Sequence, residues 1–274
     1  MKIKNYILTF ALAAFFMGGA TAQTSFIIAP EIGIHNSKSK PTGDLDLSSD
    51  FQDMDVNYSG IFSYQGGIAL GIEFGGSWAL MTGLKFNRKG GEVTVSTRDP
   101  QKPFLVNLPN GTQSTDVGEV VQSISHNWLS IPLLARAQFG NTIKVGLAIG
   151  PQFNMAMGKY KQTVEYSLEN INLSTEEEEF DFGESTGNML KKNHMSLLIT
   201  PFVSYEFAKN NSIRLAAMWE AGSNMVNDNF VVVKGIDQNT GQPVLGNVNG
   251  TMKNAQFGVM LSYEFRIGIE GGKY

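Results

Sequence analysis

The three histidines, His35, His126 and His194, are the residues of this sequence best suited to chemistry. Each falls where a predicted strand meets a long connection, which places all three at one end of the expected fold. A histidine close to a hydroxyl such as Ser125 or Ser196 activates it as a nucleophile, as in small lipid-modifying barrel enzymes. No hydrolase or acyltransferase motif surrounds the histidines, and their spacing is too wide for a metal site. We therefore predict no catalytic residue, no metal and no cofactor, and interpret the histidines as interface residues with a polar tip.

The strongest charge run is Glu176 to Glu179, followed by Asp181 and Glu184. Carboxylate oxygens bind hard divalent cations, which bridge anionic lipopolysaccharide at a cell surface. The run lacks the glycine and the ligand spacing of an EF-hand, so we expect it to be a solvated loop. Cysteine is absent from the sequence, which excludes a disulfide framework and thiolate chemistry.

The composition departs from that of a soluble domain. Charged residues make up 17% of the 274, against about 25% in an average soluble domain, while 42% are hydrophobic and 30 residues are glycine. The 21 basic and 25 acidic residues leave a net charge of −4, so a nucleic-acid partner is not expected.

The N-terminal segment has the pattern of a secretory signal peptide. Two lysines precede an apolar run over residues 6–20, and the small residues 20–22 resemble a cleavage site. The run is shorter than the roughly 20 residues of a membrane-spanning helix. We predict a signal peptide over 1–22 and one exported domain over 23–274.

The exported segment alternates with period 2 between apolar and small or polar residues, which is typical of strands with two different faces. Val145, Leu147 and Ile149, for example, are separated by glycine and alanine. Most such segments reach the about 9 to 11 residues that cross a bilayer at a tilt. The eight predicted strands are 25–35, 64–74, 76–88, 126–139, 142–157, 194–207, 212–221 and 252–267.

The connections alternate between short and long. Tight turns are expected at 74–78, 139–142 and 207–211, where glycine and asparagine suit positive φ angles. The other connections, 36–63, 89–125, 158–193 and 222–251, are long and polar. This pattern predicts an all-β fold, an eight-stranded antiparallel up-and-down transmembrane β-barrel with long extracellular loops and short periplasmic turns.

The second face of the strands is expected to fill the lumen. A secreted ligand-binding barrel would instead point its apolar face inward. The second face is crowded with glycine and alanine, which suits a narrow interior, and it carries five acids and five bases, which can neutralise one another when buried. The predicted lumen charge network consists of Glu31, Glu73, Lys85, Arg136, Lys144, Glu206, Arg214, Glu220, Glu264 and Arg266.

Aromatic residues near the strand ends predict two interfacial girdles. On the turn side these are Phe74, Trp78, Phe139, Tyr205, Phe207, Tyr263 and Phe265. On the loop side they are Phe86, Trp128, Phe153 and Trp219.

Four prolines fall inside predicted strands. Pro30, Pro132, Pro151 and Pro201 each remove a donor from the ladder, so each should lie at a bulge or in a locally unpaired position. A bulge would exchange the inner and outer faces beyond it, so the register near these prolines is left open.

The segments resemble the PorT-type outer-membrane β-barrel proteins of Bacteroidetes. The resemblance rests on the sequence WLSIPLL at 128–134, on Gly150-Pro151 in the next strand, and on LKFNRKG at 84–90. Ser130 departs from the acidic or amide residue often found before Ile-Pro in that family. The resemblance covers about residues 25–267 and implies an integral outer-membrane barrel. Some members of that family are linked to protein secretion.

An eight-stranded lumen is only wide enough for its own side chains, so porin activity is not expected. We predict a non-enzymatic protein of the Gram-negative outer membrane, a monomer whose surface loops contact other envelope proteins, glycans or lipopolysaccharide. Two alternatives remain open: an accessory component of a secretion or surface-assembly system, and an enzyme that modifies outer-membrane lipid.

Overall fold

The computed structural model describes residues 24–43, 45, 54–97, 104–105, 116–168, 171–183, 185, 188–236, 243–247 and 249–269. The predicted signal peptide and Glu184 lie outside the described residues. No helix in the described part of the chain is long and apolar enough to cross a membrane.

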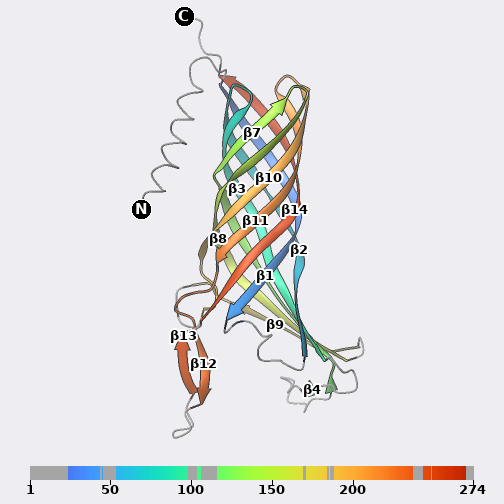
Figure 1. The fold of residues 1–274 in the computed structure, drawn as a ribbon, viewed down its shortest axis with the longest axis vertical. Helices are drawn as coiled ribbons and strands as arrows, with labels where there is room; N and C mark the ends of the chain where they lie inside the picture. Colours follow the sequence, from blue (N-terminus) through green and yellow to red (C-terminus); the bar gives the residue numbers. More distant parts are fainter. Residues whose placement is uncertain are drawn as a thin grey trace, which may run out of the picture.

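The wall of the molecule is a closed antiparallel sheet (Figure 1). Its strands are β1 (Thr24–Gly43), β2 (Met54–Phe74), β3 (Trp78–Thr97), β6 (Glu119–Pro132), β7 (Leu134–Gly140), β8 (Ile143–Leu168), β10 (Asn193–Ala208), β11 (Asn211–Asn224) and β14 (Gly250–Ile269). Strands β6 and β7 are halves of one wall strand, interrupted at Leu133, since both lie between β3 and β8. Counted this way, the described wall has eight strands, and β1 closes it by pairing with β14.

Smaller strands lie beyond the wall. Strand β9 (Ile171–Phe180) pairs with β8 alone among the described strands. Two hairpins, β4 (Phe104–Leu105) with β5 (Asp116–Val117) and β12 (Val231–Ile236) with β13 (Pro243–Asn247), form separate two-stranded sheets.

The three predicted tight turns are confirmed, and together they define the turn end of the barrel. Gly75 and Gly76 connect β2 to β3 with φ angles of 59° and 71°, and Gly140 ends β7 with a φ of 117°. Such angles are favourable for glycine because it has no Cβ. We call the opposite end the loop end.

The predicted long loops are wrong over much of their length, because the strands continue toward the loop end. Strand β1 extends to Gly43, β2 begins at Met54, β3 extends to Thr97 and β8 extends to Leu168. The outward-facing positions of these extensions are polar, for example Lys38 and Lys40 in β1 and Asp55 and Asn57 in β2, so the extensions lack the contrast between an apolar outer face and a polar inner face that marks a lipid-facing strand. Backbone pairing does not need that contrast, and it continues wherever a neighbouring strand offers donors and acceptors.

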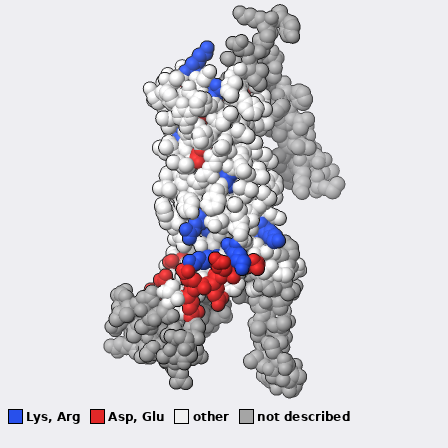
Figure 2. Space-filling model, turned by 180° about the vertical axis from the view of Figure 1, so that it is seen from behind, with Lys and Arg blue, Asp and Glu red and all other residues white. Residues whose placement is uncertain are grey.

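The apolar face points outward, as predicted. Large apolar side chains such as Ile32 (65% exposed) and Phe62 (71% exposed) cover the outer wall between the two ends. We call this surface the apolar band; Figure 2 shows it as a nearly uncharged surface.

The prolines interrupt the ladder without exchanging the faces. Pro30 and Pro201 each leave a gap in the register with one neighbour, but the partners on either side of each gap keep the same offset. Around Pro132, inward and outward residues alternate without change from β6 into β7. The face exchange considered above therefore does not occur at these three positions.

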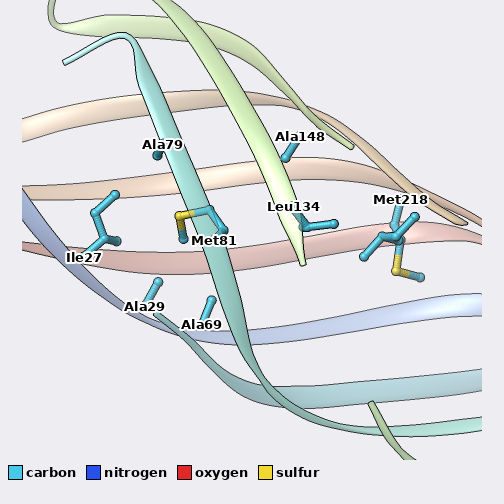
Figure 3. Packing of buried hydrophobic residues seen from close by; sticks show 9 residues of the cluster. Ile27, Ala29, Ala69, Ala79, Met81, Leu134, Ala148 and Met218 are labelled. Atoms are coloured by element: carbon cyan, nitrogen blue, oxygen red, sulfur yellow. The ribbon is translucent and has the colours of Figure 1, made fainter. Parts of the chain in front are cut away.

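Small and apolar side chains fill part of the lumen. Figure 3 shows Ile27 and Ala29 of β1, Ala69 of β2, Ala79 of β3 and other buried side chains that project from several wall strands into the lumen. The alanines among them leave room for the charged groups described next.

Candidate functional site

A network of buried ion pairs fills the lumen toward the turn end, and Arg136 lies at its centre. Arg136 Nη1 donates to Glu264 Oε1 at 2.6 Å, and Arg136 Nη2 donates to Glu73 Oε2 at 2.9 Å. Gln138 Nε2 also donates to Glu73 Oε2, at 2.8 Å. The Arg136 and Glu264 side chains are completely buried. Charges buried this deeply are tolerated because each has a partner.

Arg214 extends the network toward the middle of the barrel. Its Nη1 atom lies 3.0 Å from Glu264 Oε1, and its Nη2 atom donates to Glu31. Glu31 Oε2 in turn lies 2.6 Å from Lys85 Nζ. The guanidinium groups of Arg136 and Arg214 both lie over the ring of Phe202, at 5.8 and 5.4 Å from its centroid.

The same network continues to the turn end. Arg266 Nη2 donates to Glu264 Oε2 at 3.1 Å, and its Nη1 atom lies 3.4 Å from Glu206 Oε2. Glu206 also pairs with Lys144 at 2.7 Å, where both side chains are partly exposed. These two residues line an open depression of about 620 Å³ at the turn end. Nine of the ten predicted lumen charges therefore belong to one connected network.

The tenth, Glu220, belongs to a separate pair nearer the loop end. Lys89 Nζ donates to Glu220 Oε1, and both side chains are buried. Gln152 Nε2 donates to Glu220 Oε2 at 3.0 Å, and Lys89 also donates to Asn154 at 3.1 Å. Sequence reasoning missed Lys89 because the third predicted strand ended at residue 88. Lys89 is four residues after the inward-facing Lys85, so a longer predicted strand would have placed the Lys89 side chain in the lumen.

The lumen is not exactly neutral once this partner is included. The paired set comprises Glu31, Glu73, Glu206, Glu220 and Glu264 against Lys85, Lys89, Arg136, Lys144, Arg214 and Arg266. Five acids thus face six bases, in place of the five against five that the sequence indicated.

Trp128 was assigned to the loop-side girdle, and this is wrong. Its side chain is completely buried inside the barrel, with its ring centroid 4.4 Å from that of His194 and 5.3 Å from that of Phe182. Its indole nitrogen donates to His126. Trp128 shares the inward parity of Arg136, eight residues further on, and an aromatic at a strand end faces lipid only when its parity is outward.

The histidines are also inside the barrel, so their interpretation as interface residues is wrong. His35, His126 and His194 are at most 6% exposed. His35 Nε2 donates to the Arg88 carbonyl oxygen at 3.0 Å. Among the described residues no histidine ring hydrogen-bonds a serine, and no cluster of His, Asp and Glu suited to a metal ion is found.

An apolar cap covers the loop end of this interior. We use the term for the described residues 180–183, 185, 188–192 and 224–228, which meet at the Leu190–Val226 bridge. Lys191 N donates to Met225 O at 2.9 Å, and Asn227 N donates to Met189 O at 2.8 Å. Leu190 and Met225 are fully buried against Trp128 and Tyr160. The pKa of Tyr160 is raised to about 12 by burial under the cap.

The other aromatic residues of the predicted girdles lie on the outer wall or at its ends. Trp78, Phe139, Tyr205, Phe207 and Phe265 are exposed on the turn side, where Phe74 and Tyr263 are half-buried. On the loop side Phe153 and Trp219 are exposed, and the half-buried Phe86 stacks on Tyr64 at 6.0 Å.

The acidic run is part of a strand, which corrects the expectation of a loop. Glu176 to Glu179 lie in β9 opposite β8, and Glu177 pairs with Lys161 at 2.6 Å. Figure 2 shows acidic side chains gathered beyond one end of the uncharged wall, with basic side chains between the two. Exposed charge on a strand edge prevents another chain from pairing with it.

A closed antiparallel barrel with an apolar exterior and a paired interior is a membrane-spanning β-barrel, because closure satisfies every backbone hydrogen bond in lipid. The chain belongs to the outer membrane protein beta-barrel domain family, whose model matches residues 21–214. This membership places the protein in the outer membrane of a Gram-negative bacterium.

Several solved outer-membrane barrels are similar to this chain at low identity. Outer membrane protein OprG from Pseudomonas aeruginosa is 10% identical with a TM-score of 0.40, covering 91% of this chain and 98% of its own. Neisserial surface protein A is 11% identical with a TM-score of 0.35, covering 89% and 98%. The outer membrane protease OmpT from Escherichia coli is 12% identical with a TM-score of 0.37, covering 91% and 100%. No curated protein matches the chain.

Proposed function

We propose that this protein is a non-conducting, non-enzymatic anchor in the outer membrane, whose loop-end extensions contact proteins, glycans or lipopolysaccharide at the cell surface. The observation that carries the proposal is that side chains bridge the lumen at two levels. Arg136 hydrogen-bonds to Glu264 across the lumen, and Lys89 hydrogen-bonds to Glu220 across it nearer the loop end. The cap covers the loop end. A filled interior supports anchoring in preference to transport.

The burial of the histidines supports a non-enzymatic role. A lipid-modifying enzyme needs a nucleophile and a base that reach the substrate. His126 and His194 instead pack against Trp128 beneath the cap, away from the lipid-facing wall.

The extension of the wall supports a contact function. Strands β8 and β9 continue beyond the apolar band and carry the exposed side chains of Glu177, Glu178 and Glu179. A rigid strand pair presents a contact surface at lower entropic cost than a disordered loop does. Membership of the PorT-type group, monomeric state and cleavage after Ala22 are parts of the same proposal, and the group resemblance keeps a secretion accessory as the second candidate.

Photo-crosslinking on intact cells tests the proposal. A photoreactive amino acid at position 178 on β9 should give adducts with surface proteins, glycans or lipopolysaccharide, identified by mass spectrometry. The same amino acid at position 209, in the β10–β11 turn, is the control and should give none of these adducts. An absence of adducts at 178, or surface adducts at 209, would overturn the proposed contact surface.

Epitope tags establish the orientation independently of any contact. A tag inserted between β8 and β9 should be accessible to antibody on intact cells, whereas a tag in the 208–211 turn should need permeabilised cells. The reverse pattern would contradict the proposal.

A further inference from the structure

Two lysines face each other on the outside of the wall, beyond the apolar band. In the β1–β14 ladder Lys40 lies directly opposite Lys253, and Lys38 is the next outward-facing residue of β1 toward the band. All three side chains are exposed, and no carboxylate among the described residues pairs with them. Like charges directly opposite each other destabilise a strand pair, so an anion bound between these amines would relieve a real cost.

The three amines lie at the depth of lipid headgroups. The last apolar residues of the band on these strands are Ile34 and Phe257, which are 50% and 65% exposed. Phe257 is paired with Asn36 in this ladder, so Lys38 lies two residues beyond the level of Phe257, and Lys40 and Lys253 lie four residues beyond it. With a rise of about 3.3 Å per residue and a tilt of about 40°, they begin roughly 5 to 10 Å beyond the hydrocarbon edge, in the headgroup layer.

The two ends of the barrel differ in exposed positive charge. Among the described residues Lys209 is the one fully exposed base at the turn end, because the partly exposed Lys144 and the buried Arg266 are both paired with Glu206. At the loop end the three lysines stand together without acidic partners. A positive cluster confined to the loop end matches a membrane in which the outer leaflet carries the phosphorylated lipid.

We propose that Lys38, Lys40 and Lys253 bind a phosphate group of outer-leaflet lipopolysaccharide. The inference rests on the proposed function, which directs the loop end toward the cell surface. To the proposed function it adds which residues make one of the contacts and which chemical group they bind. This contact lies on the outer surface of β1 and β14, away from β9.

The test uses the folded full-length chain in detergent with three probes: purified lipopolysaccharide, the same lipopolysaccharide after phosphatase treatment, and inorganic phosphate. The variant Lys40→Gln/Lys253→Gln should bind lipopolysaccharide about 25-fold more weakly, at about fivefold per lysine. The matched control Lys209→Gln should bind as the wild type does. Equal binding by the double variant, or equal binding of the phosphatase-treated lipid, would overturn the proposal. Full competition by millimolar inorganic phosphate would also overturn it, because the site would then hold free phosphate.

A second variant separates repulsion from ligand binding. Lys253→Glu creates an opposite-charge pair with Lys40, so the lipid-free barrel should unfold at a higher temperature. The same variant should lose the stabilisation that lipopolysaccharide gives the wild type. If Lys253→Glu raised both the unfolding temperature of the lipid-free barrel and the stabilisation by lipopolysaccharide, or lowered both, the phosphate assignment would be wrong. Failure of the proposed function would appear separately, as a loop-end tag that antibody reaches only in permeabilised cells.

Discussion

Arg136 and Glu264 hydrogen-bond to each other across the full width of the barrel. Arg136 is on β7 and Glu264 is on β14, which are separated by three wall strands whichever way the sheet is followed. With a contact of 2.6 Å between them, the two side chains together span the lumen at this level. Lys89 on β3 and Glu220 on β11 repeat the arrangement nearer the loop end.

Removal of the central guanidinium should destabilise the barrel strongly. Arg136→Met leaves Glu73 and Glu264 with fewer buried partners, and breaking a buried pair costs about 3 to 5 kcal/mol. The heat-modifiable gel shift in detergent should therefore occur at a lower temperature. Lys144→Glu is a useful comparison. Because Lys144 is partly exposed, this substitution should lower the free energy of unfolding by only about 1 kcal/mol. Equal effects of the two variants would contradict the network described here.

The Lys89–Glu220 pair should show strong coupling in a double-mutant cycle. Either Lys89→Met or Glu220→Gln alone leaves a buried group without its charged partner, and should lower the free energy of unfolding by about 3 kcal/mol. The double variant should be less destabilised than the sum of the two. Additive effects in urea unfolding would show that the two side chains do not interact.

The three tryptophans should respond differently to lipids that carry a quencher. Trp78 and Trp219 are on the outer wall, whereas Trp128 is buried within the barrel. In variants that retain one tryptophan each, nitroxide-labelled lipids should quench Trp78 and Trp219 but leave Trp128 nearly unchanged. Strong quenching of Trp128 would restore its assignment to the girdle and remove the basis of the capped interior.

A glycine in the lumen should be far less tolerant than one on the wall. A Cβ at Gly146 would lie 2.4 Å from both Phe202 Cζ and the Ala137 carbonyl oxygen. Gly146→Ala should therefore cost about 1 to 3 kcal/mol through overpacking. Gly66→Ala is the matched control, since its nearest neighbours would be 3.7 Å or more away. Comparable unfolding temperatures for the two variants would be inconsistent with this packing.

The sequence predicts the membrane-spanning part of the fold well, because lipid on one side and a filled lumen on the other give each strand two different faces. That contrast alone identified nine members of the Arg136 network. The contrast between an apolar outer face and a polar inner face ends where the strands leave the membrane. For this reason the sequence predicts loops where β1, β3 and β8 continue as strands. Lys89 was missed for the same reason.

The cap could not be predicted from periodicity. Phe182, Leu190 and Met225 belong to very short apolar stretches within polar segments, too short to show a period, and the bridge between Leu190 and Val226 brings the two segments together. Trp128 was assigned to the girdle from its place at a strand end. Its inward parity with Arg136 was the more reliable signal.

Single-channel recording in planar bilayers tests the central claim most directly. The wild-type barrel, shown to be folded by its heat-modifiable migration, should give no steady conductance across a range of voltages, because two sets of side chains bridge the lumen and a cap covers it. Stable, ohmic conductance steps that scale with the number of inserted barrels would contradict the blocked lumen, and with it the assignment of the protein as a non-conducting anchor.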